Sequence, residues 1–251
     1  MPDSHAMTSA PQTPIVSTRQ LSRTYGEGET AVHALRDVSV AFPAGQFAAI
    51  MGPSGSGKST LMHLLAGLDS PTSGSVVVDG QELSGLDDKG LTRLRRDRLG
   101  FVFQAFNLVP VLTAEENILL PLTLASRRPD REWLDRLIDA VGLPDRLDHR
   151  PSELSGGQQQ RVAVARALVH RPAVVFADEP TGNLDSRSSE EVLALLRQAA
   201  DEFGQTVIMV THDPQAASVA DRIVVLRDGQ VVHDGDAADT EGVLDLMKAV
   251  A

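Results

Sequence analysis

Two glycine-rich stretches of this sequence have the composition of anion-binding sites. The first, GPSGSGKST at 52–60, follows an apolar run and precedes a segment with helical spacing. It fits G-x-x-x-x-G-K-[ST], a pattern in which backbone N–H groups and a helix N-terminus hold phosphate oxygens. Lys58 is therefore expected to reach the β- and γ-phosphates of a nucleotide, and Ser59 to hold Mg²⁺. The second stretch, LSGGQQQR at 154–161, has the glycines but no lysine, so its ligand needs another explanation.

Three other apolar runs end in polar residues. Asp178 and Glu179 follow AVVFA, Gln104 follows LGFVF, and His212 follows TVIMVT. Asp178 can orient Mg²⁺ through water and Glu179 can polarise an attacking water, two tasks on which phosphoryl transfer depends. His212 can sense the γ-phosphate or hold Glu179, and Gln104 can contact Mg²⁺ or water. For His212 and Gln104, a purely structural role at a strand end is the alternative.

Periodicity places these motifs on alternating strands and helices. The segments from Ile15 to Ile50 predict several strands, one of them VSVAF at 38–42. The apolar runs at 173–178 and 206–213 predict strands buried on both faces of a parallel sheet. Helical spacing dominates from about 105 to 168, and RIVVLRDGQVVHDG predicts a hairpin that turns at Asp228–Gly229. The alternation indicates an α/β fold with a helical lobe inserted after the phosphate loop.

Composition excludes several classes of protein. The chain has 251 residues, a formal net charge of −11 and no cysteine. The charge argues against a nucleic-acid or anionic-lipid binder over its whole surface, although RLRRDR at 93–98 is locally basic. The lack of thiols excludes disulfides and thiolate metal sites, which suits a reducing cytoplasm. No apolar run is long enough to span a bilayer, so membrane spans would have to come from another chain.

The order of the motifs resembles that of the ATP-binding cassette (ABC) ATPases. GPSGSGKST, the Gln after GFVF, LSGGQ, VVFADEP, GNLD and VTHD occur here in that family's order and spacing, over nearly all of 15–235. The resemblance implies an ATPase that uses ATP and Mg²⁺. Catalysis would involve Glu179, His212, Lys58 and Gln104, and the metal ligands would be Ser59, Gln104 and Asp178.

The same resemblance implies the domain organisation. The fold would be a phosphate-loop NTPase core with a RecA-like parallel sheet, an N-terminal antiparallel β subdomain and an inserted α-helical subdomain at about 105–168. Residues 15–240 would form the ATPase domain. Residues 1–14 would be a disordered tail, and 241–251 a C-terminal helix or tail.

The second glycine-rich stretch has an explanation in this family, because two ATPase units pair head to tail. Ser155, Gly156, Gly157 and Gln158 of one subunit would cap the γ-phosphate of ATP bound to the other. The lysine is missing because Lys58 of the opposite subunit supplies the charge. A homodimer on ATP binding is the simplest form of this arrangement, and a heterodimer is the alternative. The other nucleotide-binding residues would be Tyr25, Gly52, Ser54, Gly55, Ser56, Gly57, Lys58, Ser59, Thr60 and Asp185.

Two of these residues have roles that only the resemblance suggests. Tyr25 sits where the family has an aromatic residue that stacks on adenine, and a turn tyrosine packed on the core is the alternative. Asp185, in GNLD, resembles the loop that communicates between the two composite sites.

A finer resemblance is to the group of lipoprotein-releasing, macrolide-export and cell-division ATPases (LolD, MacB and FtsE). It rests on stretches such as RRDRLGFVFQAFNLVPVLTAEENILLPL and RPSELSGGQQQRVAVARAL. In that group the segment 105–117 receives a short cytoplasmic helix of the membrane partner. The apolar side chains of that groove would be Phe106, Leu108, Val109 and Leu112. The alternative is that they pack inside the helical lobe.

The implied function is that of a transporter subunit. The chain would be cytoplasmic and peripheral on the inner face of the cell membrane. Through an integral-membrane permease subunit it would drive export or release of a lipophilic peptide, drug or lipoprotein. An FtsE-like ATPase that regulates an extracytoplasmic cell-wall enzyme without moving cargo is the alternative. A DNA-acting ATPase is a third interpretation, but no nucleic-acid partner is expected.

Overall fold

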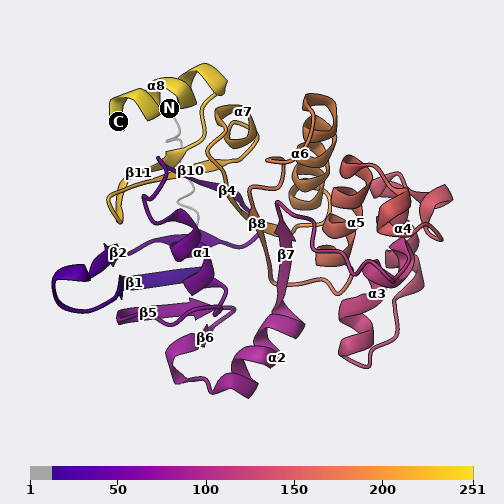
Figure 1. Cartoon of the computed structure of the whole chain (residues 1–251), viewed down its shortest axis with the longest axis horizontal. Helices are drawn as coiled ribbons and strands as arrows, with labels where there is room; N and C mark the ends of the chain where they lie inside the picture. Colours follow the sequence, from indigo (N-terminus) through magenta and orange to yellow (C-terminus); the bar gives the residue numbers. More distant parts are fainter. Residues whose placement is uncertain (1–12, 251) are drawn as a thin grey trace, which may run out of the picture.

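The computed structural model describes residues 13–250, which form two β-sheets and eight α-helices (Figure 1). The strands are β1 (Pro14–Tyr25), β2 (Val32–Val38), β3 (Ala41–Pro43), β4 (Phe47–Met51), β5 (Ser73–Val78), β6 (Gln81–Glu82), β7 (Leu99–Phe103), β8 (Val174–Asp178), β9 (Thr206–Val210), β10 (Arg222–Arg227) and β11 (Gln230–Asp236). The helices are α1 (Lys58–Leu65), α2 (Asp88–Arg98), α3 (Ala114–Leu124), α4 (Arg131–Val141), α5 (Gly156–Leu168), α6 (Ser186–Asp201), α7 (Pro214–Ala217) and α8 (Thr240–Val250).

The two sheets differ in strand direction. The first is antiparallel, with the order β2-β1-β5-β6, and β3 also pairs with β1. The second has the order β11-β10-β4-β9-β8-β7, and its strands are parallel except β11, which runs antiparallel to β10. We call this second sheet the mixed sheet. The predicted α/β fold is confirmed, with an antiparallel sheet formed by the N-terminal part of the chain.

The central strands of the mixed sheet consist mostly of apolar residues, and both of their faces are covered. Every residue of β4 and β9 is buried, as are the first four residues of β8. The parallel strands β4, β9, β8 and β7 are neighbours, so their carboxyl ends lie at one edge of the sheet. This edge positions the candidate site.

The mixed sheet separates two hydrophobic cores. Alternate residues of β4 face opposite sides: Ala48 and Ile50 belong to a core shared with α1 and the antiparallel sheet. Phe47 and Ala49 belong to the other core, which α3, α5 and α6 share. Figure 1 shows α3 to α6 gathered beyond β7 and β8, away from α1.

Some local predictions are confirmed and others are wrong. The hairpin at Asp228–Gly229 is confirmed, since these residues have φ of 50° and 78° between β10 and β11. VSVAF at 38–42 is not one strand, because β2 ends at Val38 and β3 begins at Ala41. The helix α2 was not predicted, because its sequence is mostly charged and gives little apolar periodicity.

The described part of the chain begins just before a strand and ends in a helix. Residues 1–12, most of the expected tail, lie outside the described residues, and β1 already begins at Pro14. The segment expected to be a C-terminal helix or tail carries α8. Within residues 13–250, no helix has both the length and the hydropathy that crossing a bilayer requires.

Candidate active site

The phosphate loop lies between β4 and α1. Its turns require glycine, because Gly52 and Gly57 have φ of 145° and 102°, values that side chains disfavour. A Cβ at Gly52 would overlap the carbonyl oxygen of Leu226, and one at Gly57 would overlap that of Ala34. Gly57 is also the N-cap of α1 and supplies no side-chain cap. The first N–H groups of α1 therefore remain available to a ligand.

Lys58, the first residue of α1, turns back over this loop. Its Nζ donates to the carbonyl oxygens of Gly52 (2.8 Å) and Pro53 (2.9 Å). Burial lowers the pKa of Lys58, while the charges of Glu179 and Asp178 oppose that shift. The ammonium group is thus held against the loop backbone, within the field of both carboxylates.

The acidic pair comes from the end of β8, and the histidine lies beyond β9, the strand between β8 and β4. Asp178 is the last residue of β8, and burial raises the pKa of Asp178 while the charge of His63 opposes that shift. Glu179 follows, and its Oε1 lies 2.7 Å from Nδ1 of His212, just beyond β9. Glu179 has φ of 45°, a left-handed conformation that costs a non-glycine residue about 1 kcal/mol. A cavity of about 320 Å³ beside Glu179 and His212 gives a ligand access to the carboxylate.

Gln104 follows β7 and contacts a residue that the sequence did not indicate. Its Nε2 donates to Oδ1 of Asn183 (3.1 Å), and Nδ2 of Asn183 donates to the carbonyl oxygen of Gln104 (3.1 Å). Asn183 belongs to GNLD, two residues before Asp185. An asparagine in a loop belongs to no periodic pattern, so only its position in the fold identifies it.

The residues at this edge fit a nucleotide with its metal ion. Ser56, in the phosphate loop, is buried and its Oγ has no hydrogen-bond partner, a state that a polar ligand would relieve. Residues 13–250 contain no group of three or more His, Cys, Asp or Glu placed to hold a metal. Ser59, Gln104 and Asp178 instead offer a hydroxyl, an amide and one carboxylate. That donor set suits Mg²⁺ that also binds phosphate oxygens and water.

The second glycine-rich stretch starts α5, and its own side chains cap the helix. Oγ of Ser155 accepts from N of Gln158 (3.3 Å), and Oε1 of Gln158 accepts from N of Ser155 (2.8 Å), which is a capping box. Gly157 lies against Ser188, whose Oγ a Cβ at Gly157 would touch at 2.6 Å. Asp185 accepts from N and Oγ of Ser188 (3.0 and 2.8 Å), and these hydrogen bonds lower the pKa of Asp185. Ser188, which the sequence did not indicate, thus links Gly157 to Asp185.

The two glycine-rich stretches do not meet within one chain. The helix α1 packs in the core on one face of the mixed sheet, and α5 packs in the core on the other. In the described part of the chain, no hydrogen bond joins 52–60 to 154–158. Gln104, Asp178, Glu179 and His212 all stand at the phosphate-loop edge instead.

Tyr25 ends β1 and is 39% exposed, so it is not packed on the core. Its hydroxyl donates to Oδ2 of Asp69 (2.8 Å), and a guanidinium nitrogen of Arg23 lies 2.9 Å from Oδ1 of Asp69. The Arg23 guanidinium also sits 4.5 Å from the centre of the Tyr25 ring. Asp69 follows α1, so one short segment leads from the phosphate loop to the residue that holds Tyr25. Neither Arg23 nor Asp69 was predicted.

A buried asparagine holds the segment expected to receive a membrane partner. Oδ1 of Asn117 accepts from N of Val109 (2.8 Å). Its Nδ2 donates to the carbonyl oxygens of Val109, Leu112 and Thr113. Leu108 packs against the core on the α5 side, which bears out part of the alternative that these residues fill the lobe.

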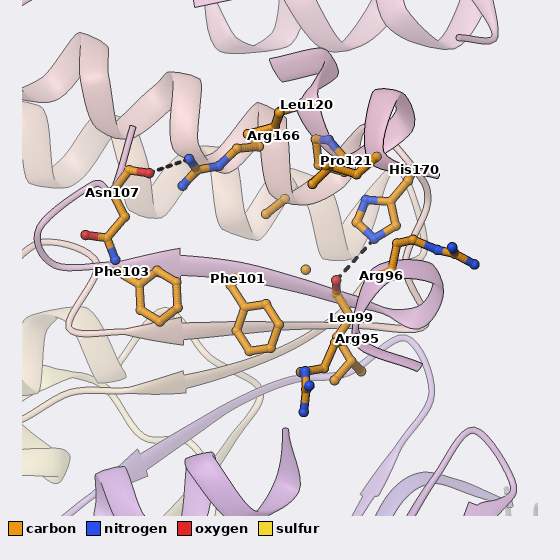
Figure 2. Close-up of a pocket in the computed structure, with 13 residues that line it drawn as sticks. Arg95, Arg96, Leu99, Phe101, Phe103, Asn107, Leu120, Pro121, Arg166 and His170 are labelled. Carbon is orange, nitrogen blue, oxygen red and sulfur yellow. Dashed lines mark hydrogen bonds between the residues drawn. The ribbon is translucent and has the colours of Figure 1, made fainter. Parts of the chain in front are cut away.

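A mostly apolar cavity of about 370 Å³ lies beside that segment, among α2, β7, α3 and α5. From 105–117 only Asn107 lines it, whereas Phe101, Phe103 and Leu120 form much of its wall (Figure 2). Leu124 also lines it. The rings of Phe101 and Phe103 stack with centres 5.7 Å apart. The space open to an apolar ligand is therefore displaced from the predicted stretch toward β7 and α3.

Comparison with known sequences identifies relatives of this chain. A family model described as "ABC transporter" matches residues 35–182. The macrolide export ATP-binding/permease protein MacB of Marinobacter nauticus is 48% identical over 226 residues, which are 89% of this chain and 35% of that protein. The chain thus spans about a third of the length of the MacB relatives it matches. The uncharacterized ABC transporter ATP-binding protein MJ0796 of Methanocaldococcus jannaschii is 44% identical over 88% of this chain and 96% of its own length.

Solved structures agree with these relatives. A dimeric post-hydrolysis state of the ATP-binding cassette MJ0796, bound to ADP and Pi, superposes with a TM-score of 0.79 at 43% identity, covering 89% of this chain and 99% of that one. The cbiO1 subunit of Clostridium perfringens superposes with a TM-score of 0.81 at 28% identity, covering 95% and 94%. The family model matches more than half of the sequence, and MJ0796 aligns with this chain over nearly its whole length. The solved structures share the fold. The chain belongs to the ABC transporter family and is an ATP-binding cassette ATPase.

Proposed function

We propose that two copies of this chain pair head to tail around two Mg-ATP molecules and drive a separate integral-membrane permease subunit, which exports or releases a lipophilic peptide, drug or lipoprotein. The observation that carries the pairing is that α1 and α5, the two helices with glycine-rich starts, pack in cores on opposite faces of the mixed sheet. Neither start reaches the other within one chain, and head-to-tail pairing of two copies would bring Ser155 of one copy to the phosphate loop of the other. The dimeric, ADP- and Pi-bound state of MJ0796 supports this arrangement.

Hydrolysis would take place at the edge of the mixed sheet. The loop N–H groups and Lys58 hold the phosphates, and Glu179 accepts a hydrogen bond from the attacking water. His212 orients Glu179 through their 2.7 Å contact. Ser59, Gln104 and Asp178 would hold Mg²⁺, which would neutralise charge on the phosphates when bound. The start of α5 in the other subunit completes the site with N–H groups and a positive helix end.

The permease would dock in the apolar cavity among α2, β7, α3 and α5, which we call the docking cavity. Gln104 stands only three residues before Asn107, which lines that cavity. The same loop therefore contacts the metal-binding edge at one end and the partner at the other. On this proposal, 15–240 form the ATPase domain, 105–168 its helical subdomain, and the chain lies at the inner face of the membrane through its partner.

A pull-down tests pairing and docking together. Tagged Glu179→Gln protein is incubated with detergent-solubilised membranes of its own host, with and without Mg-ATP, and the complexes are sized by light scattering. We expect the mass of the purified variant to double with ATP and a membrane protein to co-purify. A variant that stays monomeric in saturating Mg-ATP would overturn the pairing. A complex with a large extracytoplasmic domain that activates a cell-wall hydrolase and carries no lipophilic cargo would favour the regulatory alternative.

A further inference from the structure

The docking cavity is shaped for the side chains of a helix rather than for its backbone. Phe101 and Phe103 of β7 lie opposite Leu120 and Pro121 of α3 (Figure 2), and Leu124 at the end of α3 is 69% exposed. An α-helix has a diameter of about 10 Å, more than a volume of about 370 Å³ can enclose. A helix lying across the mouth would therefore insert only its apolar anchor residues.

Arg166 of α5 places a positive charge in this apolar wall. Its guanidinium donates to the carbonyl oxygens of Asn107 (2.6 Å) and Phe106 (2.8 Å). None of the ion pairs formed within residues 13–250 includes Arg166. Burial lowers the pKa of Arg166, because a cation without a counter-charge is disfavoured away from water. Arginine has five N–H donors, so several remain for a ligand.

The rim of the docking cavity adds further cations. Arg96 of α2 lines it, and its partner Asp97 is shared with Arg127, which follows α3. One carboxylate thus faces two guanidinium groups. Figure 2 shows Arg166 and Asn107 at one end of the cavity and Arg96 at the other. This local excess of positive charge stands in a chain whose net charge is −11.

We infer that the permease segment seated in the docking cavity is a helix with an otherwise apolar inner face and one carboxylate, which pairs with Arg166. The inference rests on the proposed function, since it requires a membrane partner in this cavity. Guanidinium and carboxylate groups form paired, charge-assisted hydrogen bonds.

This pairing would also select the partner. Cytoplasmic loops of membrane proteins carry an excess of Lys and Arg. Such a loop would be repelled by Arg166, Arg95 and Arg96, which line the cavity, unless it offered a carboxylate at the right place. Repulsion of ordinary loops, together with attraction of one acidic helix, is how an interface discriminates among partners.

Photo-crosslinking from the rim identifies the segment. Leu124 is replaced by benzoylphenylalanine in the full chain, the host cells are irradiated, and the crosslinked peptide is sequenced by mass spectrometry. We expect a cytoplasmic segment of an integral membrane protein with an Asp or Glu within one helical turn, about four residues, of the crosslinked position. A segment without a carboxylate, a lipid, or a second copy of this chain would overturn the inference.

Variants that neutralise Arg166 or the partner's carboxylate then measure how much the ion pair contributes to binding. Arg166→Gln, or replacing the partner's carboxylate by its amide, should each weaken the complex about 10- to 100-fold in Kd. The double variant should be little weaker than either single one, because the pair is lost only once. Arg166→Lys should recover part of the affinity, and Arg136→Gln on α4, away from the cavity, should change nothing.

The variant in the partner keeps the inference testable even if Arg166→Gln fails to fold. If neutralising the partner's carboxylate leaves Kd unchanged, the inference is wrong whatever happens to Arg166. If a membrane protein is captured through an uncharged segment, this inference fails and the proposed function stands. If the chain hydrolyses ATP but no membrane protein is captured at all, both fail.

Discussion

The starts of α1 and α5 are both rich in glycine, yet their caps differ. At α1, Gly57 has φ of 102° and no side chain caps the helix. At α5, Ser155 and Gln158 close a reciprocal capping box. The first start leaves its N–H groups without partners and has Lys58 beside them, whereas the second is largely satisfied by its own residues.

This difference indicates how each start can bind an anion. The start of α1 is incomplete until phosphate fills it, so it is suited to hold a nucleotide by itself. The start of α5 is stable alone and keeps only the N–H groups of Gly156 and Gly157 free of the capping box. It therefore suits a surface that is brought to an anion already bound elsewhere, as the proposed head-to-tail pairing requires.

The variants with the largest expected effect test whether the start of α1 in one subunit and the start of α5 in the other form one active site. Lys58→Ala and Ser155→Arg should each lower ATP hydrolysis by about 10²-fold or more, while Ser155→Arg monomers still bind ATP. Mixing the two inactive proteins should restore about a quarter of the parental rate. The reason is that half of the dimers are mixed and each has one intact composite site.

The control for this experiment is each variant alone at the same total concentration, measured by phosphate release. If the mixture stays as inactive as its components, the two starts do not combine in trans. Full activity of Ser155→Arg would remove the role given to the start of α5.

The next largest effect concerns Glu179, which lies at the phosphate-loop edge and has no counterpart at the start of α5. Glu179→Gln should slow hydrolysis about 10²- to 10⁴-fold, because the amide cannot accept a proton from the attacking water. ATP binding, measured by calorimetry, should stay within a few-fold of the parent. Hydrolysis near the parental rate would show that another residue does this work.

A smaller effect compares the glycines of the two starts. Gly57→Ala should destabilise the protein by about 1–3 kcal/mol, because its Cβ meets the Ala34 carbonyl and its φ is left-handed. Gly156→Ala should change the free energy of unfolding by no more than about 0.5 kcal/mol, since nothing lies within 3.6 Å of its Cβ. Urea unfolding of the two variants gives both values. Equal losses would contradict the difference between the starts.

The smallest expected effect is the stability that the capping box of Ser155 and Gln158 contributes. Ser155→Ala should destabilise the protein by about 1 kcal/mol, whereas Ser155→Thr, which keeps a hydroxyl, should lose less. Hydrogen exchange at the first turn of α5 should rise in the alanine variant and stay near the parental value in the threonine variant. Unchanged exchange in both would mean that the box contributes little.

The sequence predicted the parts of the site that depend on strand order and motif. Asp178 ends β8, Glu179 and Gln104 directly follow β8 and β7, and His212 lies just beyond β9. Adjacent parallel strands end at one edge, so the proximity of these residues along the sheet follows from the alternation. The phosphate loop was predictable because its glycines and lysine are consecutive.

The residues that the sequence missed make long-range contacts. Asn183 pairs with Gln104 across 79 positions, and Asp69 pairs with Tyr25 across 44. Such pairs become visible only when the fold brings them together. The sequence also placed the docking groove at 105–117, whereas the docking cavity lies beside that segment. The reason is again a set of tertiary contacts, because the hydrogen bonds of Asn117 fold the segment onto the helical lobe.

The left-handed backbone of Glu179 has a consequence for engineering. At φ of 45°, glycine would relieve about 1 kcal/mol of strain. A laboratory screen that rewarded only survival at high temperature would therefore favour Glu179→Gly, and shelf life would rise as turnover was lost. Any stabilisation campaign on this protein should hold that position fixed.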